Sequence, residues 1–323
     1  MGETGVNLRR RHLGHTGLTV SEIGFGAWAI GGGFNVAGLR LGYGETNDEE
    51  SLAALARAFA LGVNFVDTAD AYGMGRSESL IGKALKSSPR RVYLATKVGN
   101  VRRDPEPPRK DFSPEYIRQA CDLSLHRMGV TSLDLYQLHN PSREVITDGR
   151  VWEVLRELKH KGKISHYGIS IGDPEEGLLA IRHGEVETIQ LTYHLLDTRA
   201  ATELFPEAEK RGVGIIVREP LANGLLTGKY GPGHRFADTD HRRDKYPPEK
   251  LQQVLARVEK LKALVRPGRT LAQAAIRFAL APMAVSAVIP GVKTAQQAEE
   301  NVAAASSAEL TKEELALGGV NGA

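Results

Sequence analysis

The chain has 323 residues, of which 41% are hydrophobic and 25% are charged, a composition typical of a globular protein. Its formal net charge of +3 is too small to indicate nucleic-acid binding, and its single cysteine, Cys121, excludes an intrachain disulfide and the usual cysteine-rich zinc site. The basic N-terminus lacks the apolar run of a signal peptide, and no stretch approaches 18 apolar residues, so we expect a cytoplasmic protein that does not span a membrane.

Short apolar segments alternate with helical patterns along the chain. Strands are predicted at Leu18–Phe25, Val63–Asp67, Val92–Lys97, Leu133–Leu138, Ile164–Ser170, Thr188–Leu191, Val213–Val217 and Val285–Ile289. Helices are predicted at Asp48–Leu61, Ser77–Leu85, Ser113–Met128, Val151–Lys161, Pro174–His183, Leu204–Arg211, 249–264, 270–281 and Thr294–Ala305. Eight such repeats predict a parallel (β/α)8 TIM barrel, with an open doubly wound sheet as the alternative. No Pro- or Ser-rich linker interrupts the pattern, so residues 1–323 are expected to form one domain.

Two local patterns refine this prediction. Ser113 followed by Pro114 is a strong helix start, and Cys121 lies on the apolar face of the helix that follows, which favours a core position for its thiol. Three polar or Gly-rich stretches, residues 30–45, 99–112 and 231–249, are predicted to be loops; the last two are expected over a barrel mouth, and the first is either a mobile flap or a plain connector.

Polar residues gather where the predicted strands end, which is where barrel enzymes carry their reactive groups. Asp67 ends the second strand and Tyr72 follows it, Lys97 ends the third strand, and His139 follows the fourth. Each residue alone could be structural, but their joint placement suits carbonyl reduction, in which hydride attack leaves an oxygen that needs a proton. Tyr72 could donate that proton if the Lys97 ammonium lowers its pKa.

In this interpretation Asp67 pairs with Lys97, and His139 donates a hydrogen bond to the substrate oxygen. A Schiff-base aldolase that uses Lys97 is an alternative, but it needs a lysine of depressed pKa, and an Asp67 partner would keep that lysine charged. No metal site is expected, because the ten histidines show no ligand spacing. The pairs His12/His15 and His160/His166 are expected to be solvated. The basic run 9–11 could be a nucleic-acid-binding arm, but a solvated or phosphate-facing lead-in to the fold is favoured.

The segment Gly24–Ala29 (GFGAWA) matches the G-x-G-x-x-A dinucleotide fingerprint, with Glu45 about twenty residues on. The residues that follow, IGGGFN, are unsuited to opening a helix, so a phosphate there would lack a helix N-terminus. We therefore interpret the match as coincidental.

Several separated motifs resemble those of the aldo-keto reductase family. They are FVDTADAYGMGRSESLIGKAL, ATKVG, LYQLHNP, GIS, QLTYHLLD, VREPLANGLLTGKY and VIPGVKTAQQAEEN, and they run in family order from about Leu13 to Ala305. The resemblance implies reduction of a small aldehyde or ketone with hydride from NADPH. It also implies that Tyr72 is the general acid, assisted by Asp67, Lys97 and His139.

The resemblance also implies a cofactor site. Ser170 and Gln190 would hold the nicotinamide amide, Arg218 stands where many relatives stack an aromatic ring on the nicotinamide, and Trp28 would line the substrate pocket or touch the nicotinamide. Residues expected along the pyrophosphate are Pro220, Leu221, Gly224, Leu226 and Lys229. Residues expected around the adenosine are Gly291, Lys293, Thr294, Gln297 and Asn301.

Two positions depart from the family pattern. Gln297 stands where some relatives have an arginine that grips the 2′-phosphate, so this grip would rest on Lys293 and Thr294; NADPH is the expected cofactor and NADH the alternative. Ile171 replaces an asparagine that contacts the nicotinamide in many relatives. A cofactor-binding regulatory subunit of the same fold, like the potassium-channel β subunits, is the alternative function. We expect a monomer, with a homo-oligomer as the alternative, and the sequence does not identify the substrate.

Overall fold

The computed structural model describes residues 8–319 except positions 43, 45, 89, 184–185, 238–239 and 241. One sheet contains, in spatial order, β3 (Phe25–Gly26), β6 (Phe65–Asp67), β7 (Tyr93–Val98), β10 (Leu133–His139), β11 (Ile164–Ser170), β12 (Thr188–Thr192), β13 (Gly214–Arg218) and β14 (Val285–Ile289). All neighbours in it are parallel, and the bridges Ile23–Val288 and Gly26–Gly291 join its first and last strands. The predicted (β/α)8 barrel is confirmed, and the open-sheet alternative is excluded.

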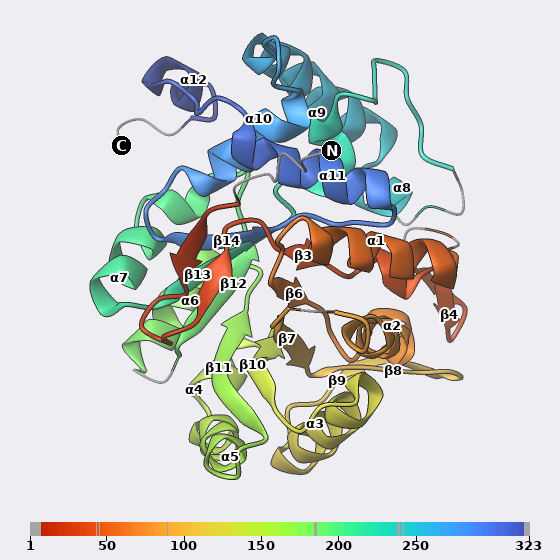
Figure 1. Ribbon diagram of the computed structural model, residues 1–323, viewed down its shortest axis with the longest axis vertical. Coiled ribbons are helices and arrows are strands. Elements are labelled where there is room, and N and C mark those ends of the chain that lie inside the picture. The colour runs from red at the N-terminus through yellow and green to blue at the C-terminus, as the bar shows by residue number, and fades with distance from the viewer. Residues whose placement is uncertain are drawn as a thin grey trace.

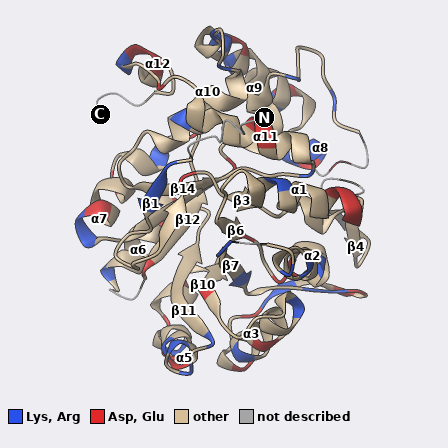
Figure 2. Cartoon of the chain, in the orientation of Figure 1, with Lys and Arg blue, Asp and Glu red and all other residues tan. Residues whose placement is uncertain are grey.

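Helices surround the strands on all sides (Figure 1). The α-helices are α1 (Asp48–Ala60), α2 (Arg76–Leu85), α3 (Pro114–Met128), α4 (Arg143–Thr147), α5 (Gly149–His160), α6 (Pro174–Arg182), α7 (Leu204–Arg211), α8 (Arg242–Lys245), α9 (Pro248–Leu261), α10 (Leu271–Leu280), α11 (Ala295–Ala303) and α12 (Lys312–Ala316). Charged residues occur mainly in the helices and loops, whereas the strands are mostly uncharged (Figure 2). Apolar residues between the helices and the sheet form the main core.

The start of α3 agrees with its sequence signal. The Ser113 hydroxyl accepts a hydrogen bond from the backbone N–H of Tyr116 at 3.3 Å, and Pro114 occupies the first turn, where its missing N–H costs nothing. Cys121 is fully buried in the core, and burial raises the pKa of its thiol to about 12. The thiol is therefore a packing group, as predicted, rather than a nucleophile.

The predicted first strand, Leu18–Phe25, is wrong as a single element. Thr19–Ser21 forms β2, which pairs antiparallel with β1 (Arg10–His12), and only Phe25–Gly26 enters the barrel. Leu13, directly after β1, and Val20, in the middle of β2, pack against residues inside the barrel such as Phe65, at the start of β6. The hairpin thus covers the amino-terminal opening of the barrel, a role that alternating apolar residues do not distinguish from a barrel strand.

Within the basic run at the N-terminus, Arg9 and Arg10 are exposed, as expected, whereas Arg11 is partly buried and has a structural role. The Arg11 guanidinium forms an ion pair with the buried Glu22 and donates hydrogen bonds to the carbonyl oxygens of Leu280 and Val285, at 3.0 and 2.9 Å. These bonds attach the hairpin to the segment before β14. Arg9 forms an exposed ion pair with Glu309.

Two of the three predicted loops contain β-hairpins. Residues 30–45 contain β4 (Phe34–Val36) and β5 (Leu39–Leu41), and residues 99–112 contain β8 (Asn100–Arg103) and β9 (Glu106–Lys110). The hairpins touch, since the backbone N–H of Ala37 donates to Asp104 Oδ1 at 3.0 Å. The strands β8 and β9 were not predicted because the segment is polar and β9 contains two prolines. Proline occurs in a sheet only on an edge strand, so it argues against a strand in the sequence. The third stretch, 231–249, contains the short helix α8 and the start of α9.

The rejected dinucleotide fingerprint also has a structural explanation. Residues Ala29–Gly31 form one 3₁₀ turn, and the chain then enters β4, so no helix follows the glycines. Gly26 is small because a side chain there would lie 2.6 Å from the carbonyl oxygen of Ile289. Its role is thus the close approach of β3 to β14 that closes the barrel. Glu45 lies outside the described residues.

Candidate active site

A buried lysine links two other predicted residues at the carboxyl ends of β6 and β7. Lys97 Nζ donates to Asp67 Oδ1 at 2.5 Å, to the carbonyl oxygen of Thr68 at 2.8 Å and to the Tyr72 hydroxyl oxygen at 3.1 Å. These bonds use all three hydrogens of the ammonium. Burial would lower the pKa of Lys97, but the Asp67 carboxylate outweighs burial, and the pKa is raised overall. Lys97 is therefore a fixed positive charge.

Tyr72 is buried beside two aromatic rings. Its ring lies edge-on to Trp28, with centroids 4.7 Å apart, and edge-on to His139, with centroids 5.8 Å apart. Because Lys97 can only donate, the Tyr72 oxygen accepts that bond, and its own O–H is left to point elsewhere. The expected net lowering of the Tyr72 pKa is wrong, because burial raises it by more than the Lys97 ammonium lowers it. Tyr72 is a neutral hydroxyl at neutral pH.

His139 ends β10 and is neutral at physiological pH. Burial, followed by the positive charges of Lys97 and Arg218, places the pKa of its imidazole well below the usual range. Its Nδ1 atom is buried and makes no hydrogen bond to any residue that the structure describes. A neutral imidazole still carries one N–H, so His139 can donate a hydrogen bond without carrying charge.

The second oxygen of Asp67 holds two glutamines, of which only Gln190 was predicted in the site. Gln190 Nε2 and Gln137 Nε2 donate to Asp67 Oδ2 at 2.7 and 3.1 Å. Since a carboxylate only accepts, both amides turn their nitrogens toward Asp67, and Gln190 Oε1 then accepts from the Ser170 hydroxyl at 3.3 Å. The sequence did contain a signal that Gln137 belongs to the site. Alternate residues of a β-strand face the same side, and Gln137 is two residues before His139 in the same strand.

These groups open into a cavity of about 900 Å³. Most predicted site residues line it, namely Trp28, Asp67, Tyr72, His139, Gln190, Arg218, Pro220, Leu221, Gly224, Lys229, Gly291, Lys293, Gln297 and Asn301. Four predicted residues lie behind its surface. Lys97 and Ser170 support Tyr72 and Gln190, Leu226 is fully buried, and the Thr294 side chain caps α11 by accepting from the Gln297 N–H at 3.1 Å.

The cavity also has lining residues that sequence reasoning missed, including Gly26, Ala27, Ala29, Asn140, Glu219, Asn223, Thr227, Arg242, Lys245, Thr270, Ala272, Gln273, Ile289 and Glu300. Among them Glu219 joins two elements, because it forms ion pairs with Arg218 at 2.6 Å and with Lys245 of α8 at 3.0 Å. A short basic helix inside a polar stretch has no distinguishing pattern, so the position of α8 beside the cavity could not be predicted.

One end of the cavity is basic. Lys229, Arg242, Lys245 and Lys293 line it together, and Arg242 is held by Asp240 at 2.5 Å. Gln297 Oε1 accepts from the Lys293 backbone N–H at 2.8 Å and so fixes the turn before α11. Burial, and then the nearby Arg242, lower the pKa of Lys293. Such a cluster of cations suits phosphate groups.

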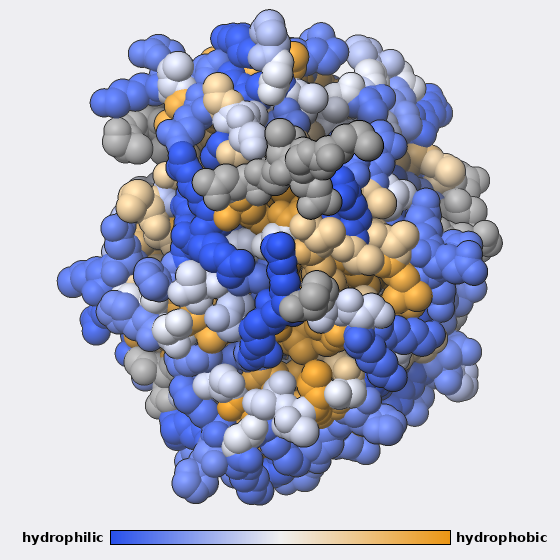
Figure 3. Space-filling view, viewed as in Figure 1, coloured by the Kyte–Doolittle hydropathy of each residue, from blue (hydrophilic) through white to orange (hydrophobic). Residues whose placement is uncertain are grey.

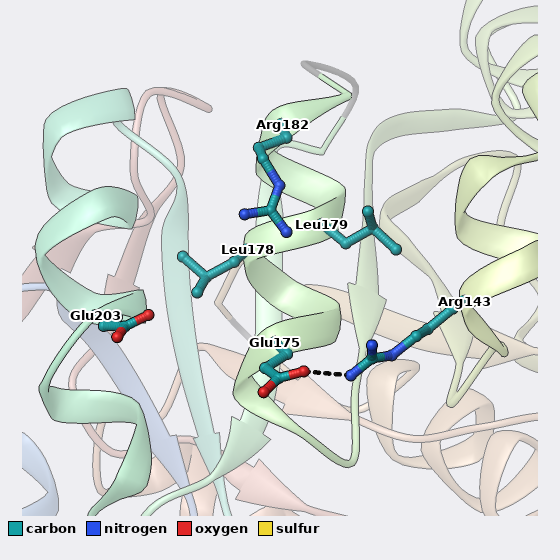
Figure 4. A pocket seen from close by; sticks show the side chains of 6 residues that line it. All are labelled: Arg143, Glu175, Leu178, Leu179, Arg182 and Glu203. Atoms are coloured by element: carbon teal, nitrogen blue, oxygen red, sulfur yellow. Dashed lines mark hydrogen bonds and ion pairs between the residues drawn. The ribbon is translucent and has the colours of Figure 1, made fainter.

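Two other features lie outside this cavity. A smaller hollow of about 250 Å³ lies along α6. Its lining includes the partly buried Leu178 and Leu179, and Arg143 pairs with Glu175 beside them (Figure 4). His166, expected to be solvated, is instead half-buried, with its Nδ1 2.7 Å from Glu187 Oε1.

In the described part of the chain, no three His, Cys, Asp or Glu side chains are grouped as metal ligands, and no helix is long and apolar enough to cross a membrane.

Residues 22–317 match the model of the aldo/keto reductase family. The chain belongs to the aldo-keto reductase family. An oxidoreductase of Bacillus subtilis (strain 168) is 32% identical over 309 residues, covering 95% of this chain and 94% of its own. An NADH-specific methylglyoxal reductase of Escherichia coli (strain K12) is 31% identical, covering 92% of this chain and 93% of its own. A solved aldo-keto reductase from Bacillus halodurans, in its holo form, superposes with a TM-score of 0.79 at 30% identity, covering 97% and 96% of the two chains.

This aldo-keto reductase carries a buried carboxyl, Asp70, beside its site. The Tyr116 hydroxyl donates to Asp70 Oδ2 at 3.3 Å, whereas Oδ1 has no partner among the residues described. Burial, followed by the nearby Glu78, raises the pKa of Asp70 to about 7. The folded protein therefore binds this proton more tightly than the unfolded chain, and its stability falls as the pH rises from about 4 to about 7.

Replacing Asp70 with asparagine is expected to remove that contribution. The wild type should lose more unfolding free energy than Asp70→Asn when the pH rises from roughly 5 to 8. At about 1.4 kcal/mol per pKa unit, the difference between the two proteins should be at most about 3 kcal/mol. Urea denaturation of the wild type and of Asp70→Asn at both pH values measures this difference. An identical pH dependence in the two proteins would contradict the assignment.

Proposed function

We propose that the protein reduces an aldehyde or ketone to an alcohol, with Tyr72 as the proton donor and a nicotinamide cofactor as the hydride source, acting as a single barrel domain. The observation that carries this proposal is the Tyr72 hydroxyl, which faces the cavity beside His139 and accepts its only described hydrogen bond from a charged lysine, Lys97. This arrangement supplies a proton to a carbonyl oxygen and stabilises the oxygen anion that Tyr72 becomes.

Each residue has a distinct part in that step. The substrate oxygen takes the Tyr72 proton while His139, neutral, donates a hydrogen bond that orients the carbonyl. The Lys97 ammonium, already 3.1 Å from the Tyr72 oxygen, stabilises the phenolate that remains. Asp67 keeps Lys97 charged and in place, and Gln137 and Gln190 hold Asp67 in turn.

The cavity residues fit a nicotinamide dinucleotide, which supplies the hydride when bound. Gln190 has both amide hydrogens committed to Asp67 and Gln137, so only its oxygen is left to accept from the carboxamide. Arg218 donates to the Ile171 carbonyl oxygen at 3.0 Å and to Glu219, which fixes a guanidinium plane that can stack on the nicotinamide ring. Ser170 supports Gln190, and Trp28 packs edge-on against Tyr72 at the nicotinamide end.

The remaining cofactor residues follow the groove toward α11. Residues proposed along the pyrophosphate are Pro220, Leu221, Gly224 and Lys229, with Leu226 packed behind them. Residues proposed around the adenosine are Gly291, Lys293, Gln297 and Asn301, with Thr294 holding the α11 N-terminus. The basic end of the cavity favours NADPH, with Lys293 on the 2′-phosphate. NADH is the alternative cofactor, since one relative is named as an NADH-specific reductase.

Lys293→Ala is expected to weaken NADPH binding by about 10- to 100-fold, the effect of one lost charge-assisted hydrogen bond, and to change NADH binding by much less. Titration of protein fluorescence with each cofactor gives both dissociation constants. Lys245→Ala is the matched control, because the Lys245–Glu219 pair is expected to affect both cofactors alike. Equal losses for NADPH and NADH in Lys293→Ala would contradict the assignment.

The proposed activity is tested by mixing the purified protein with 4-nitrobenzaldehyde and NADPH, then NADH, and following the nicotinamide absorbance. We expect turnover, faster with NADPH. Tight cofactor binding without turnover of any carbonyl compound would favour a regulatory subunit instead.

A further inference from the structure

We propose that the cavity mouth beside His139 binds a carboxylate on the substrate, so that the preferred substrates are aldehydes or ketones that carry an anionic group. The proposal rests on the proposed reductase function and names the substrate class for the same site. It is carried by two basic side chains of the β8–β9 hairpin, Arg102 and Lys110, together with the amide of Asn140.

The hairpin starts two residues after β7, the strand of Lys97, and therefore rises from the carboxyl end of the barrel. In Figure 1 it extends between α2 and α3. Lys110 Nζ donates to the carbonyl oxygen of Asn140 at 2.5 Å, and the Asn140 N–H donates to the carbonyl oxygen of Ser170 at 2.7 Å. Because Asn140 follows His139 and lines the cavity, Lys110 is held one residue from the proposed catalytic imidazole.

Arg102 is half-buried without a counter-ion. Its single hydrogen bond runs from Nη1 to the carbonyl oxygen of Val101 at 3.0 Å, and no carboxylate in the described ranges lies within 4.0 Å of Arg102 or Lys110. The Arg102 side chain is partly buried and therefore partly desolvated, and this burial lowers the pKa of its guanidinium. A desolvated guanidinium without a carboxylate is costly, so an anion from outside the chain is the partner that would offset the cost.

The balance of charge around His139 supports the same ligand. After burial, the groups that lower the His139 pKa are four positive side chains: Lys97, Arg218, Arg102 and Lys110. Asp67 neutralises Lys97, and Glu219 neutralises Arg218. Asp70 acts on Arg102, but burial raises its pKa to about 7, so it is charged only in part at neutral pH. The hairpin therefore leaves an excess of positive charge, which attracts an anionic substrate.

The side chain of Asn140 provides a third polar group. Its Oδ1 atom is buried, and neither end of the amide hydrogen-bonds to a residue in the described structure. The backbone on both sides of it is fixed by Lys110 and Ser170, so the amide has a defined position. An amide N–H there can donate to the same carboxylate, while the carbonyl end of the substrate reaches Tyr72.

The test compares 4-carboxybenzaldehyde with its methyl ester, which has nearly the same shape and reactivity but no charge. We expect the wild type with NADPH to show a kcat/KM at least about 10-fold higher for the acid, and salt to lower the acid's value alone. Arg102→Gln should reduce the acid-to-ester ratio by about 10-fold and Lys110→Gln by about 3-fold, since Lys110 is more exposed.

Arg103→Gln is the matched control. Arg103 is adjacent to Arg102 on β8, is exposed and pairs in register with Glu106, so its loss should leave the ratio and the activity unchanged. If the wild type reduces the ester as well as the acid, or if Arg102→Gln keeps the ratio, the inference is overturned while the reductase function stands. If neither compound is reduced, the proposed function itself fails.

Discussion

Tyr72→Phe is expected to lower kcat/KM for carbonyl reduction by about 10²- to 10⁴-fold, the usual contribution of a positioned acid. The variant loses one oxygen atom but keeps the ring that packs against Trp28 and His139. Cofactor binding should therefore be nearly unchanged, and the loss should appear in kcat. Steady-state rates with NADPH and 4-nitrobenzaldehyde, alongside the dissociation constant for NADPH, measure both quantities.

Tyr116→Phe is the control for this substitution, because it removes a tyrosine hydroxyl that donates to Asp70 outside the proposed proton path. Its kcat should stay within a few-fold of the wild type. If Tyr72→Phe retained comparable activity, another group would have to supply the proton, and the assignment of Tyr72 would be wrong.

Lys97→Met is expected both to abolish turnover and to destabilise the fold by about 3–5 kcal/mol, as when one partner of a buried ion pair is removed. Without the ammonium, Asp67 would be a buried carboxylate with only two amide donors, and the Tyr72 oxygen would lose its hydrogen bond. Urea denaturation at neutral pH gives the change in unfolding free energy.

The double variant Asp67→Asn/Lys97→Met separates the two effects. Removing both charges should restore most of the lost stability, since no unpaired charge remains, but none of the activity. A single variant as stable as the wild type, or a double variant that turns over substrate, would contradict the roles given to this pair.

The strand ends explain why the clustering of the four central residues could be predicted. A parallel barrel directs the carboxyl ends of its strands to one side, so Asp67, Lys97 and His139 meet although they are far apart in sequence. Tyr72 follows from its short distance to Asp67 in the chain. The direction of the Tyr72 pKa could not be predicted, because it depends on how deeply the ring is buried, and burial is a property of the packed structure.

Elements that depend on irregular backbone were missed. The hairpins β4–β5 and β8–β9 and the helix α8 are made of elements of three to five residues, too short to show the periodicity that identifies longer elements. Their positions determine where Arg102, Lys110 and Lys245 lie, and Lys245 lines the cavity. Gln137 is a different case, since its strand was predicted, but only the structure shows that its amide contacts Asp67.

The most direct test of the central claim follows a deuterium atom. The wild type would be incubated with NADPH that is deuterated at C4 of the nicotinamide and with 4-nitrobenzaldehyde, and the alcohol would be analysed by mass spectrometry. The account predicts that hydride passes from C4 of the nicotinamide to the carbonyl carbon. When the label is on the face of C4 that is transferred, each alcohol molecule therefore carries one deuterium. The absence of alcohol, or alcohol without deuterium from NADPH labelled on either face of C4, would contradict the claim.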